Sequence, residues 1–441
     1  MKRALILYLF STTFLSVNSQ IFNGDLLFKY AQENSPKLQN AKLDVFLSDE
    51  KIKEIRASGL PKINGELSFQ NFVNVPTTVV PANAFNPTAP KDELVGLSFG
   101  TPFNANYNLK VSQLIFSFSY IYALKAAQNY SELSRLAKLQ VNENFLEQIN
   151  LNLGQIILIK KQKELLNQNI KEVQVLKTKT NSLISAGVME QSSVNDIAIM
   201  EIEFKNALEL LKSNEQLAIL NLKTSIGYPV DSSIALIEDF EMASKTPLNN
   251  STLNPSNSSA VKMGQQNVIL NELSLKASQS DGYPSIYGFF NQQHMAMRNN
   301  FNFFDTSKDW YPATLWGINV TIPLYNSGEG KAKNKQKEFE IEKAKNELVD
   351  IENQIASLYE MLKNNYQNAV LNLNSQKTKV DLIQKVYQNE EKKLSHGASN
   401  SLLLSQRKIQ LLQANQDLIQ KEYELYKAEV QLNTHTNSLK L

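Results

Sequence analysis

The chain has 441 residues, with 45 basic and 43 acidic side chains, so its net charge is close to zero. This balance argues against a nucleic-acid-binding protein, which would carry a basic excess on one face. Gly and Pro are scarce for this length, at 15 and 13 residues, and a shortage of such breakers indicates long uninterrupted elements.

Residues 1–19 have the features of a secretory signal peptide. Lys2 and Arg3 precede an apolar stretch that begins at Ala4, and a small-residue cleavage site ends at Ser19. A buried N-terminal helix is the alternative. The chain has no Cys, so we expect no disulfide and no lipid-modified cysteine. No later apolar run reaches about 18 residues, which predicts an exported protein without a spanning helix, in the periplasm, outside, or in an outer-membrane β-barrel.

The first predicted structural repeat covers residues 20–227. It begins with a helix from about Asp25 to Arg56, which ends before Gly59 and Pro61. Alternating apolar and polar residues predict strands at about 63–75 and 107–116. The proline-rich segment from Val73 to Asn106 is expected to be a long loop. A long helix, a hairpin turn at 186–188 and a second helix complete the repeat.

Residues 228–259 are rich in Pro, Ser and Asn and are interpreted as a linker between the repeats. The second repeat, residues 260–441, has the same order: a helix, strands at about 285–293 and 314–324, a long helix, a hairpin turn at 396–398 and a helix. The last strand alternates strictly around Trp316, and Pro323 removes a ladder donor and ends it. A helical pattern begins at Gly328.

Three pairs of short segments indicate an internal duplication. Residues 59–63 correspond to 282–286, 113–116 to 322–325, and 186–187 to 396–397. The spacing differs between the pairs because the first loops of the two repeats have unequal lengths.

The four predicted strands are suited to a membrane. Each is about ten residues long, enough to cross a bilayer when tilted, and residues 283–325 hold 11 of the 39 aromatic residues, as interfacial girdles do. One strand face is expected to form a polar channel wall: Asn64, Glu66, Asn108, Lys110, Asn319 and Thr321. The core of a small soluble sheet is the alternative. Four strands cannot close a barrel alone, so the barrel interpretation predicts an oligomer.

The long helices carry coiled-coil seams. Apolar residues recur at spacings of three and four from Ile341 to Leu362, at spacings of seven from Leu404 to Leu432, and in the same pattern from Ile197 to Ala218. The helices that start at about Tyr120 and Gly328 each run some 65 residues, on the order of 100 Å at 1.5 Å per residue. Such a length is expected of a tube, a stalk or a bundle that bridges a wide space.

Together these motifs resemble the TolC-like outer-membrane efflux protein family. Residues 323–328 resemble its signature at the joint where the last strand enters a long helix, with Pro323, Leu324, Tyr325 and Gly328 at the matching positions. Leu26, Ala31, Asn34, Pro36 and Leu38 resemble the opening helix. The turns Ala186-Gly187-Val188 and His396-Gly397-Ala398 resemble the two hairpin turns of the family.

The resemblance implies a mainly α fold with a membrane β-barrel portion, in which long coiled-coil helices form an α-barrel. Three copies would supply four strands each to a 12-stranded barrel in the outer membrane of a Gram-negative bacterium, with the helices extending into the periplasm. It further implies an exit duct of a tripartite efflux pump or a type I secretion system that works with an inner-membrane transporter and a periplasmic adaptor. Outer-membrane lipid surrounds such a barrel.

The resemblance also assigns candidate sites. The six turn residues Ala186, Gly187, Val188, His396, Gly397 and Ala398 are expected to contact the adaptor. Family members often place acidic residues just after the turns, at the inner constriction, whereas this chain has Ser193, Leu403 and Gln406 there. We hypothesise that Leu402 and Leu403 form an apolar constriction that gates by dewetting. The alternative is that both leucines are ordinary coiled-coil seam residues.

The sequence predicts no enzyme, no cofactor and no metal site. The three His residues, 294, 396 and 435, are scattered and form no ligand pattern. His396 is expected to cap a helix C-terminus, and the carboxylates of Glu201 and Glu203 are expected to be solvated. The competing function is a structural periplasmic stalk or adaptor with a small soluble β domain.

Overall fold

The structure, a computed structural model, describes residues 21–435 except 23, 188–189, 237–254 and 397. The predicted signal peptide and much of the predicted linker lie outside the described residues, as do Val188 and Gly397. The chain forms two compact units. The first consists of residues 1–44, 135–263 and 349–441, and the second of residues 45–134 and 264–348.

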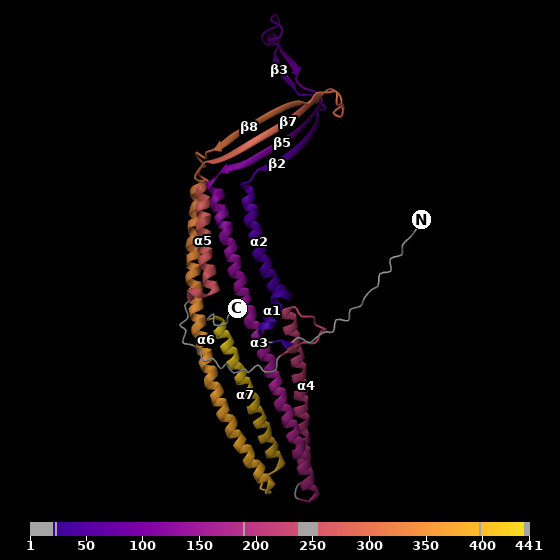
Figure 1. Cartoon of the computed structure of the whole chain (residues 1–441), viewed down its shortest axis with the longest axis vertical. Helices are drawn as coiled ribbons and strands as arrows, with labels where there is room; N and C mark the ends of the chain where they lie inside the picture. The colour runs from indigo at the N-terminus through magenta and orange to yellow at the C-terminus, as the bar shows by residue number, and fades with distance from the viewer. Residues whose placement is uncertain (1–20, 23, 188–189, 237–254, 397, 436–441) are drawn as a thin grey trace, which may run out of the picture. The chain divides into compact units, whose positions relative to one another are not determined.

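The helices repeat in length, and the predicted mainly α fold with an internal duplication is confirmed (Figure 1). The α-helices in the described part of the chain are α1 (Gly24–Asn34), α2 (Pro36–Ser58), α3 (Phe118–Ser185), α4 (Ser192–Ile226), α5 (Ser259–Ser280), α6 (Glu329–Ser395) and α7 (Ser401–His435). The long helices α3 and α6 have 68 and 67 residues, and α4 and α7 have 35 each. No helix among these residues has a stretch both long and apolar enough to cross a membrane.

The single helix expected at about 25–56 is divided into α1 and α2, so this prediction was wrong in one detail. Pro36 is the first residue of α2 and cannot donate a backbone hydrogen bond, which suits the start of a helix and not its interior. Ser35 lies between the helices. Its hydroxyl donates a hydrogen bond of 2.9 Å to the Ser225 carbonyl, which fixes the break against the end of α4.

The second unit contains a four-stranded antiparallel sheet in the order β2-β5-β7-β8. Its strands are β2 (Lys62–Asn71), β5 (Phe103–Phe116), β7 (Ser285–Arg298) and β8 (Tyr311–Thr321). The register pairs Glu66 with Asn108 and Asn64 with Lys110. Through β7, the same face of β5 continues to Asn319 and Thr321 of β8. All six predicted wall residues therefore lie on one face, the polar face.

Apolar side chains occupy the opposite, apolar face of the sheet. Ile63 pairs with Val111, which pairs with Phe290, which pairs with Trp316. These side chains do not form a core within the chain, since Trp316 is 75% exposed and Ile63 is 69% exposed. Strand β7 extends beyond the predicted 285–293 because its ladder with β5 continues through Gln293 to Arg298, where the alternation in sequence is lost.

The segment 73–106, expected to be a loop, contains a β-hairpin of β3 (Thr77–Pro81) and β4 (Leu94–Ser98). Its short strands lie between prolines, so they give little periodic signal. The β7–β8 connection behaves differently, because its Phe301 and Phe303 pack on Phe69 of the apolar face at centroid distances of 5.4 and 5.7 Å. The β7–β8 connection thus packs on the apolar face, whereas the base of the β3–β4 hairpin lies beside the polar face.

The first unit is held together by seams between its helices. One cluster packs α1 and the start of α2 against α3 and the end of α4, and includes Leu27, Ile149 and Leu222. A second packs α3 and α4 against Leu412 of α7, and includes Ile197, Met200 and Phe204 of the predicted seam. The seams of α6 and α7 are buried at Ala344, Leu362, Leu404 and Leu411. A short parallel pair joins β1 (Ile21–Phe22) to β6 (Ala235–Leu236).

Candidate functional site at the helical hairpin ends

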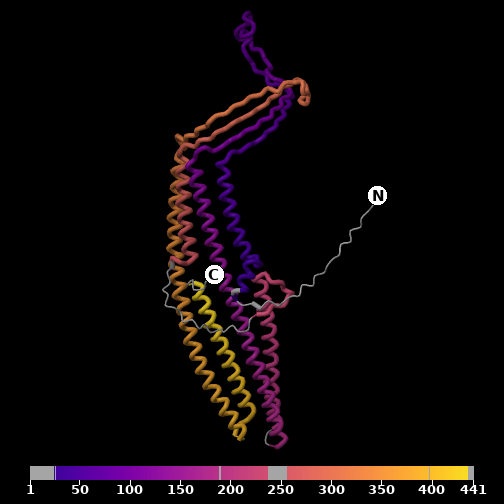
Figure 2. Tube along the Cα trace, viewed as in Figure 1, coloured from indigo at the N-terminus to yellow at the C-terminus, as the bar shows by residue number. Residues whose placement is uncertain are grey.

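The chain reverses direction after α3 and again after α6, and both reversals belong to the first unit (Figure 2). After α3, Ala186 and Gly187 are exposed and the Gly187 amide donates to the Ile184 carbonyl at 2.9 Å. Gly187 has a φ of +71°, the left-handed conformation that commonly ends helices. Helix α4 then begins without a side-chain cap from Gln191.

Among the described residues, the second turn has more capping contacts than the first. The His396 Nδ1 lies 2.7 Å from the Lys392 carbonyl, and the Ala398 amide donates to the Lys393 carbonyl at 2.9 Å. The predicted capping role of His396 is thereby confirmed. At the start of α7, the Asn400 Oδ1 accepts a hydrogen bond of 2.8 Å from the Leu403 amide, as an N-cap does. His396 and Ala398 are exposed.

A buried lysine connects the two hairpins. The ammonium of Lys408 on α7 forms an ion pair with Glu172 on α3 and lies 5.1 Å from the ring centroid of Tyr387 on α6. The Lys408 side chain is 4% exposed and that of Glu172 is 46% exposed. Burial, and then the negative charges of Glu391 and Glu172, raise the pKa of Tyr387 to about 12. Tyr387 therefore stays neutral and can receive the cation on its face.

Polar contacts recur along α7 at the period of the coiled coil. Ser401, Lys408, Asn415, Glu422 and Glu429 are spaced by sevens. In this row, Glu422 pairs with Lys161 of α3 at 3.0 Å, and the Ser401 hydroxyl donates to Asp196 of α4 at 3.4 Å. Lone polar residues at seam positions specify register at some cost in stability. The row therefore aligns α7 with the α3–α4 hairpin.

The expectation that Glu201 and Glu203 are both solvated was wrong for Glu201. Its side chain is 11% exposed and is held by Lys205 at 2.7 Å and Lys177 at 3.0 Å. The hydrogen bonds from Lys205 and then Lys177 lower its pKa to about 2. The helical pattern of the sequence places Glu201 on α4. Its burial, however, depends on packing against α3, which cannot be predicted from the neighbouring sequence.

The four residues proposed for the constriction lie near the starts of α4 and α7. Ser193 and Leu403 are half-buried, Gln406 is exposed, and Leu402 is 52% exposed. The buried seam residue here is Leu404, at 1% exposure. Within the chain, Leu402 therefore lies outside the buried seam, and its role in a constriction stays a prediction.

The two strand-to-helix joints belong to the second unit and differ in construction. In the first repeat, β5 enters α3 through Ser117, after a register shift between Leu114 and Phe116. In the second repeat, Pro323, Leu324 and Tyr325 separate β8 from α6, and both Leu324 and Tyr325 are highly exposed. Ser327 and Gly328 are both left-handed, with φ of 52° and 85°. They turn the chain so that the Glu329 amide donates to the Asn326 carbonyl at 3.0 Å.

Sequence reasoning missed Lys408, Glu172 and Asn400. A signal for Lys408 exists, because a lysine four residues after Leu404 and three before Leu411 occupies a seam position. No such pattern identifies Glu172, since an exposed glutamate on a long helix is common. Within the described residues, no group of three His, Asp or Glu side chains is placed to hold a metal ion.

Comparisons with known proteins give a consistent result. Residues 255–438 match the family model described as outer membrane efflux protein. A search of curated protein sequences gave no match. Among solved structures, the chain is similar to CusC, described in relation to transmembrane channel formation, at a TM-score of 0.76 and 14% identity, with 94% of this chain and 91% of that one covered.

Two further structures have the same fold. The outer membrane protein VceC from Vibrio cholerae gives a TM-score of 0.72 at 13% identity, covering 94% of this chain and 95% of that one. The open state of the Neisseria gonorrhoeae MtrE outer membrane channel gives 0.73 at 11% identity, covering 94% and 88%. At these identities the likeness shows the fold, and it extends over both repeats.

Proposed function

We propose that this chain, whose residues 255–438 match the outer membrane efflux protein family model, is a member of that family and serves as the outer-membrane exit duct of a tripartite efflux pump or a type I secretion system. It conducts solutes passively and performs no covalent chemistry. The observation that carries the proposal is the sheet in the second unit, which has one polar face, one apolar face, and two edges that no other described strand of the chain covers.

The strand order supports closure by copies of the chain. All neighbours in the order β2-β5-β7-β8 are antiparallel, so β2 and β8 run in opposite directions. An edge β2 of one copy can therefore pair with β8 of the next in a ring that is antiparallel throughout. Backbone groups in lipid must be satisfied, so a spanning sheet must close. Three copies give 12 strands, an even number like that of bacterial outer-membrane barrels.

The distribution of side chains supports lipid outside and water inside. The apolar face exposes Leu67, Trp316 and Ile318, which suits lipid, and the polar face suits a channel. Aromatic residues gather at both ends of the strands. Phe69 and Phe103 lie in a cluster with Phe301 at one end, and Phe116 packs on Phe118 at 4.9 Å at the other.

The competing stalk or adaptor function is less well supported. A soluble β domain would bury its apolar face against a second layer, and large exposed apolar patches on soluble proteins are uncommon. Here no described element covers Trp316 or Ile318, which are 75% and 63% exposed. We therefore favour the duct.

The partners in this proposal are a periplasmic adaptor and an inner-membrane transporter. The exposed turn residues Ala186, Gly187, His396 and Ala398 are the proposed adaptor contacts, together with Val188 and Gly397. Opening separates the hairpin ends, and the Lys408–Glu172 pair is one of the contacts that oppose it. Leu402 and Leu403 are proposed as an apolar constriction, for which the exposure of Leu402 gives support.

The proposal is tested on the protein purified from outer membranes. We expect a heat-modifiable trimer that forms conducting channels in planar bilayers; recovery as a soluble monomer would rule out the duct. Leu403→Asp should change single-channel conductance or cation preference, and an unchanged channel would count against the apolar constriction.

A separate measurement tests the turns. Because the chain has no Cys, Ala186→Cys and Ala398→Cys can each carry a unique photo-cross-linker. Both should capture the adaptor, whereas Asn364→Cys, an exposed position in the interior of α6, should not. Equal capture at all three positions would contradict specific contact at the turns.

A further inference from the structure

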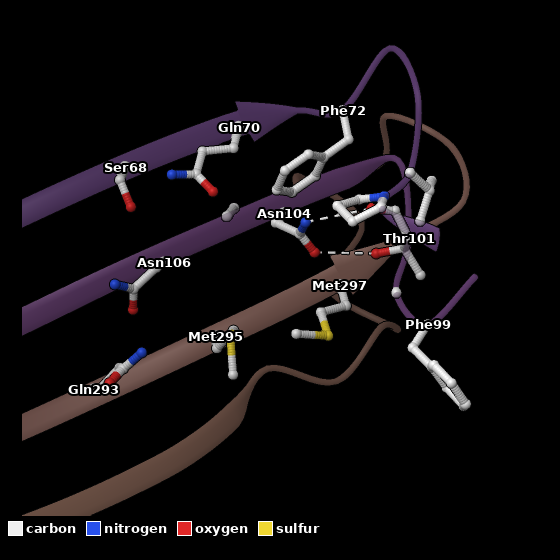
Figure 3. A pocket seen from close by; sticks show the side chains of 14 residues that line it. Ser68, Gln70, Phe72, Phe99, Thr101, Asn104, Asn106, Gln293, Met295 and Met297 are labelled. Atoms are coloured by element: carbon white, nitrogen blue, oxygen red, sulfur yellow. Dashed lines mark hydrogen bonds between the residues drawn. The ribbon is translucent and has the colours of Figure 1, made fainter. Parts of the chain in front are cut away.

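The polar face of the sheet carries a preformed pocket of about 410 Å³ within the second unit (Figure 3). Its floor comes from three strands: Ser68 and Gln70 of β2, Asn106 of β5, and Gln293, Met295 and Met297 of β7. The register places these side chains on the same face, since Ser68 pairs with Asn106 and Asn106 with Met295. The remaining wall comes from residues 72–76 and 99–101, at the base of the β3–β4 hairpin.

Hydrogen bonds hold that wall in place. The Phe72 amide donates to the Pro102 carbonyl at 2.7 Å. The Thr101 hydroxyl donates to the Asn104 Oδ1 at 3.1 Å, and the Asn104 Nδ2 donates back to the Thr101 carbonyl at 3.3 Å (Figure 3). Asn104 is therefore occupied in shaping the pocket, while Phe72 and Pro76 supply apolar surface beside it.

The chemistry of the pocket selects against charge. None of its fourteen lining residues is Asp, Glu, Lys, Arg or His, so a charged solute would lose hydration without gaining a counter-ion. Among the described residues, the Asn106 Oδ1 is buried and has no hydrogen-bond partner. An unpaired buried acceptor is costly, and rotation of the Asn106 amide toward the pocket would let a bound donor satisfy it.

The apolar part of the lining is adaptable. Met295 and Met297 lie two residues apart on β7 and point to the pocket side, and unbranched thioether side chains fit surfaces of different shapes. A volume of about 410 Å³ lies within the range of small-molecule sites. These features favour a molecule with an apolar body and polar groups.

We propose that this pocket binds an uncharged amphipathic solute of drug size that donates a hydrogen bond to Asn106. Its role as a station on the export path rests on the proposed duct, because there the polar face borders the channel. Binding itself requires only the folded sheet and its hairpin, so the pocket and the duct can be tested apart.

The absence of Cys allows a direct binding test. Ser68→Cys places a thiol in the pocket, and Ser112→Cys places one on the same polar face of β5 outside it. The purified assembly is labelled with a maleimide in the presence of chloramphenicol, an uncharged amphipathic probe, or of its anionic succinate ester. Chloramphenicol should slow labelling at Ser68→Cys at least about threefold, and neither compound should affect Ser112→Cys.

Adding Asn106→Ala to Ser68→Cys tests the acceptor. The half-protecting concentration should rise about five- to tenfold, as expected for one lost hydrogen bond, while the heat-modifiable band and channel conductance show that the assembly is intact. Absence of protection, equal protection by the succinate ester, or equal protection of Ser112→Cys would overturn the proposal. A conducting trimer without protection leaves the duct standing, and protection without conduction contradicts the duct alone.

Discussion

Removing either partner of the Lys408–Glu172 pair should have unequal effects, because only one partner is buried. The Lys408 side chain is 4% exposed, and Glu172 is 46% exposed. In Glu172→Gln, a buried ammonium loses its counter-ion. Breaking a buried pair in this way costs about 3–5 kcal/mol, and water access at the glutamate side reduces our expectation to about 2 kcal/mol.

Lys408→Met removes the buried charge instead and keeps an unbranched chain of similar length. Glu172 is then left hydrated, and the loss of a solvent-exposed ion pair costs about 0–1 kcal/mol of stability. We therefore expect Lys408→Met to change the stability of the hairpin ends by less than about 1 kcal/mol. The double variant should be no less stable than Lys408→Met alone.

Hydrogen exchange of α7 amides near Lys408 measures local opening directly. A loss of about 2 kcal/mol corresponds to exchange about 30-fold faster in Glu172→Gln. Glu164→Gln, at an exposed position on the same helix, controls for the loss of any glutamate and should not change exchange. Greater destabilisation by Lys408→Met than by Glu172→Gln would refute the argument from burial.

Two further predictions concern the first unit. Gly227 and Gly187 have φ of 74° and 71°, but a Cβ on Gly227 would lie 2.2 Å from the Asn34 carbonyl oxygen, whereas one on Gly187 would meet nothing within 4 Å. Gly187→Ala should cost about 1 kcal/mol and Gly227→Ala about 2–4 kcal/mol in thermal unfolding followed by circular dichroism; equal costs would contradict the clash. Glu201 has its pKa lowered from 4.5 to about 2, so its contribution is present above about pH 4.5 and is lost as pH falls toward 2. Between about pH 5 and pH 3 we expect a loss of about 2 kcal/mol, absent in Glu201→Gln and retained in Glu203→Gln.

The elements most accessible from sequence were those with a strong local period. Strict alternation around Trp316 predicted β8, and spacings of three, four and seven predicted the seams at Ile197 and Leu404, all of which the structure contains. The lengths of α3 and α6 followed from the scarcity of Gly and Pro. The alternation of polar and apolar residues also predicted a shared polar face of the sheet, and the strand register in the structure aligns those residues.

Features that depend on distant segments could not be predicted in this way. The β3–β4 hairpin pairs residues such as Thr77 and Ser98 across a proline-rich segment with no long alternation. Glu201 is buried beside lysines on two helices, and Lys408 is buried beside a glutamate 236 positions away. In each case, the sequence shows an ordinary polar residue, and only tertiary packing decides whether that residue is solvated.

The two open edges of the sheet have a consequence for biogenesis. In the proposed duct, a single copy cannot remain in lipid with unpaired β2 and β8, so membrane insertion and assembly would have to occur together. A variant that damages one edge would then be dominant over the wild type. In a cell that makes equal amounts of both, rings built only from healthy copies would be about one in eight for a threefold assembly, and export would fall far below half.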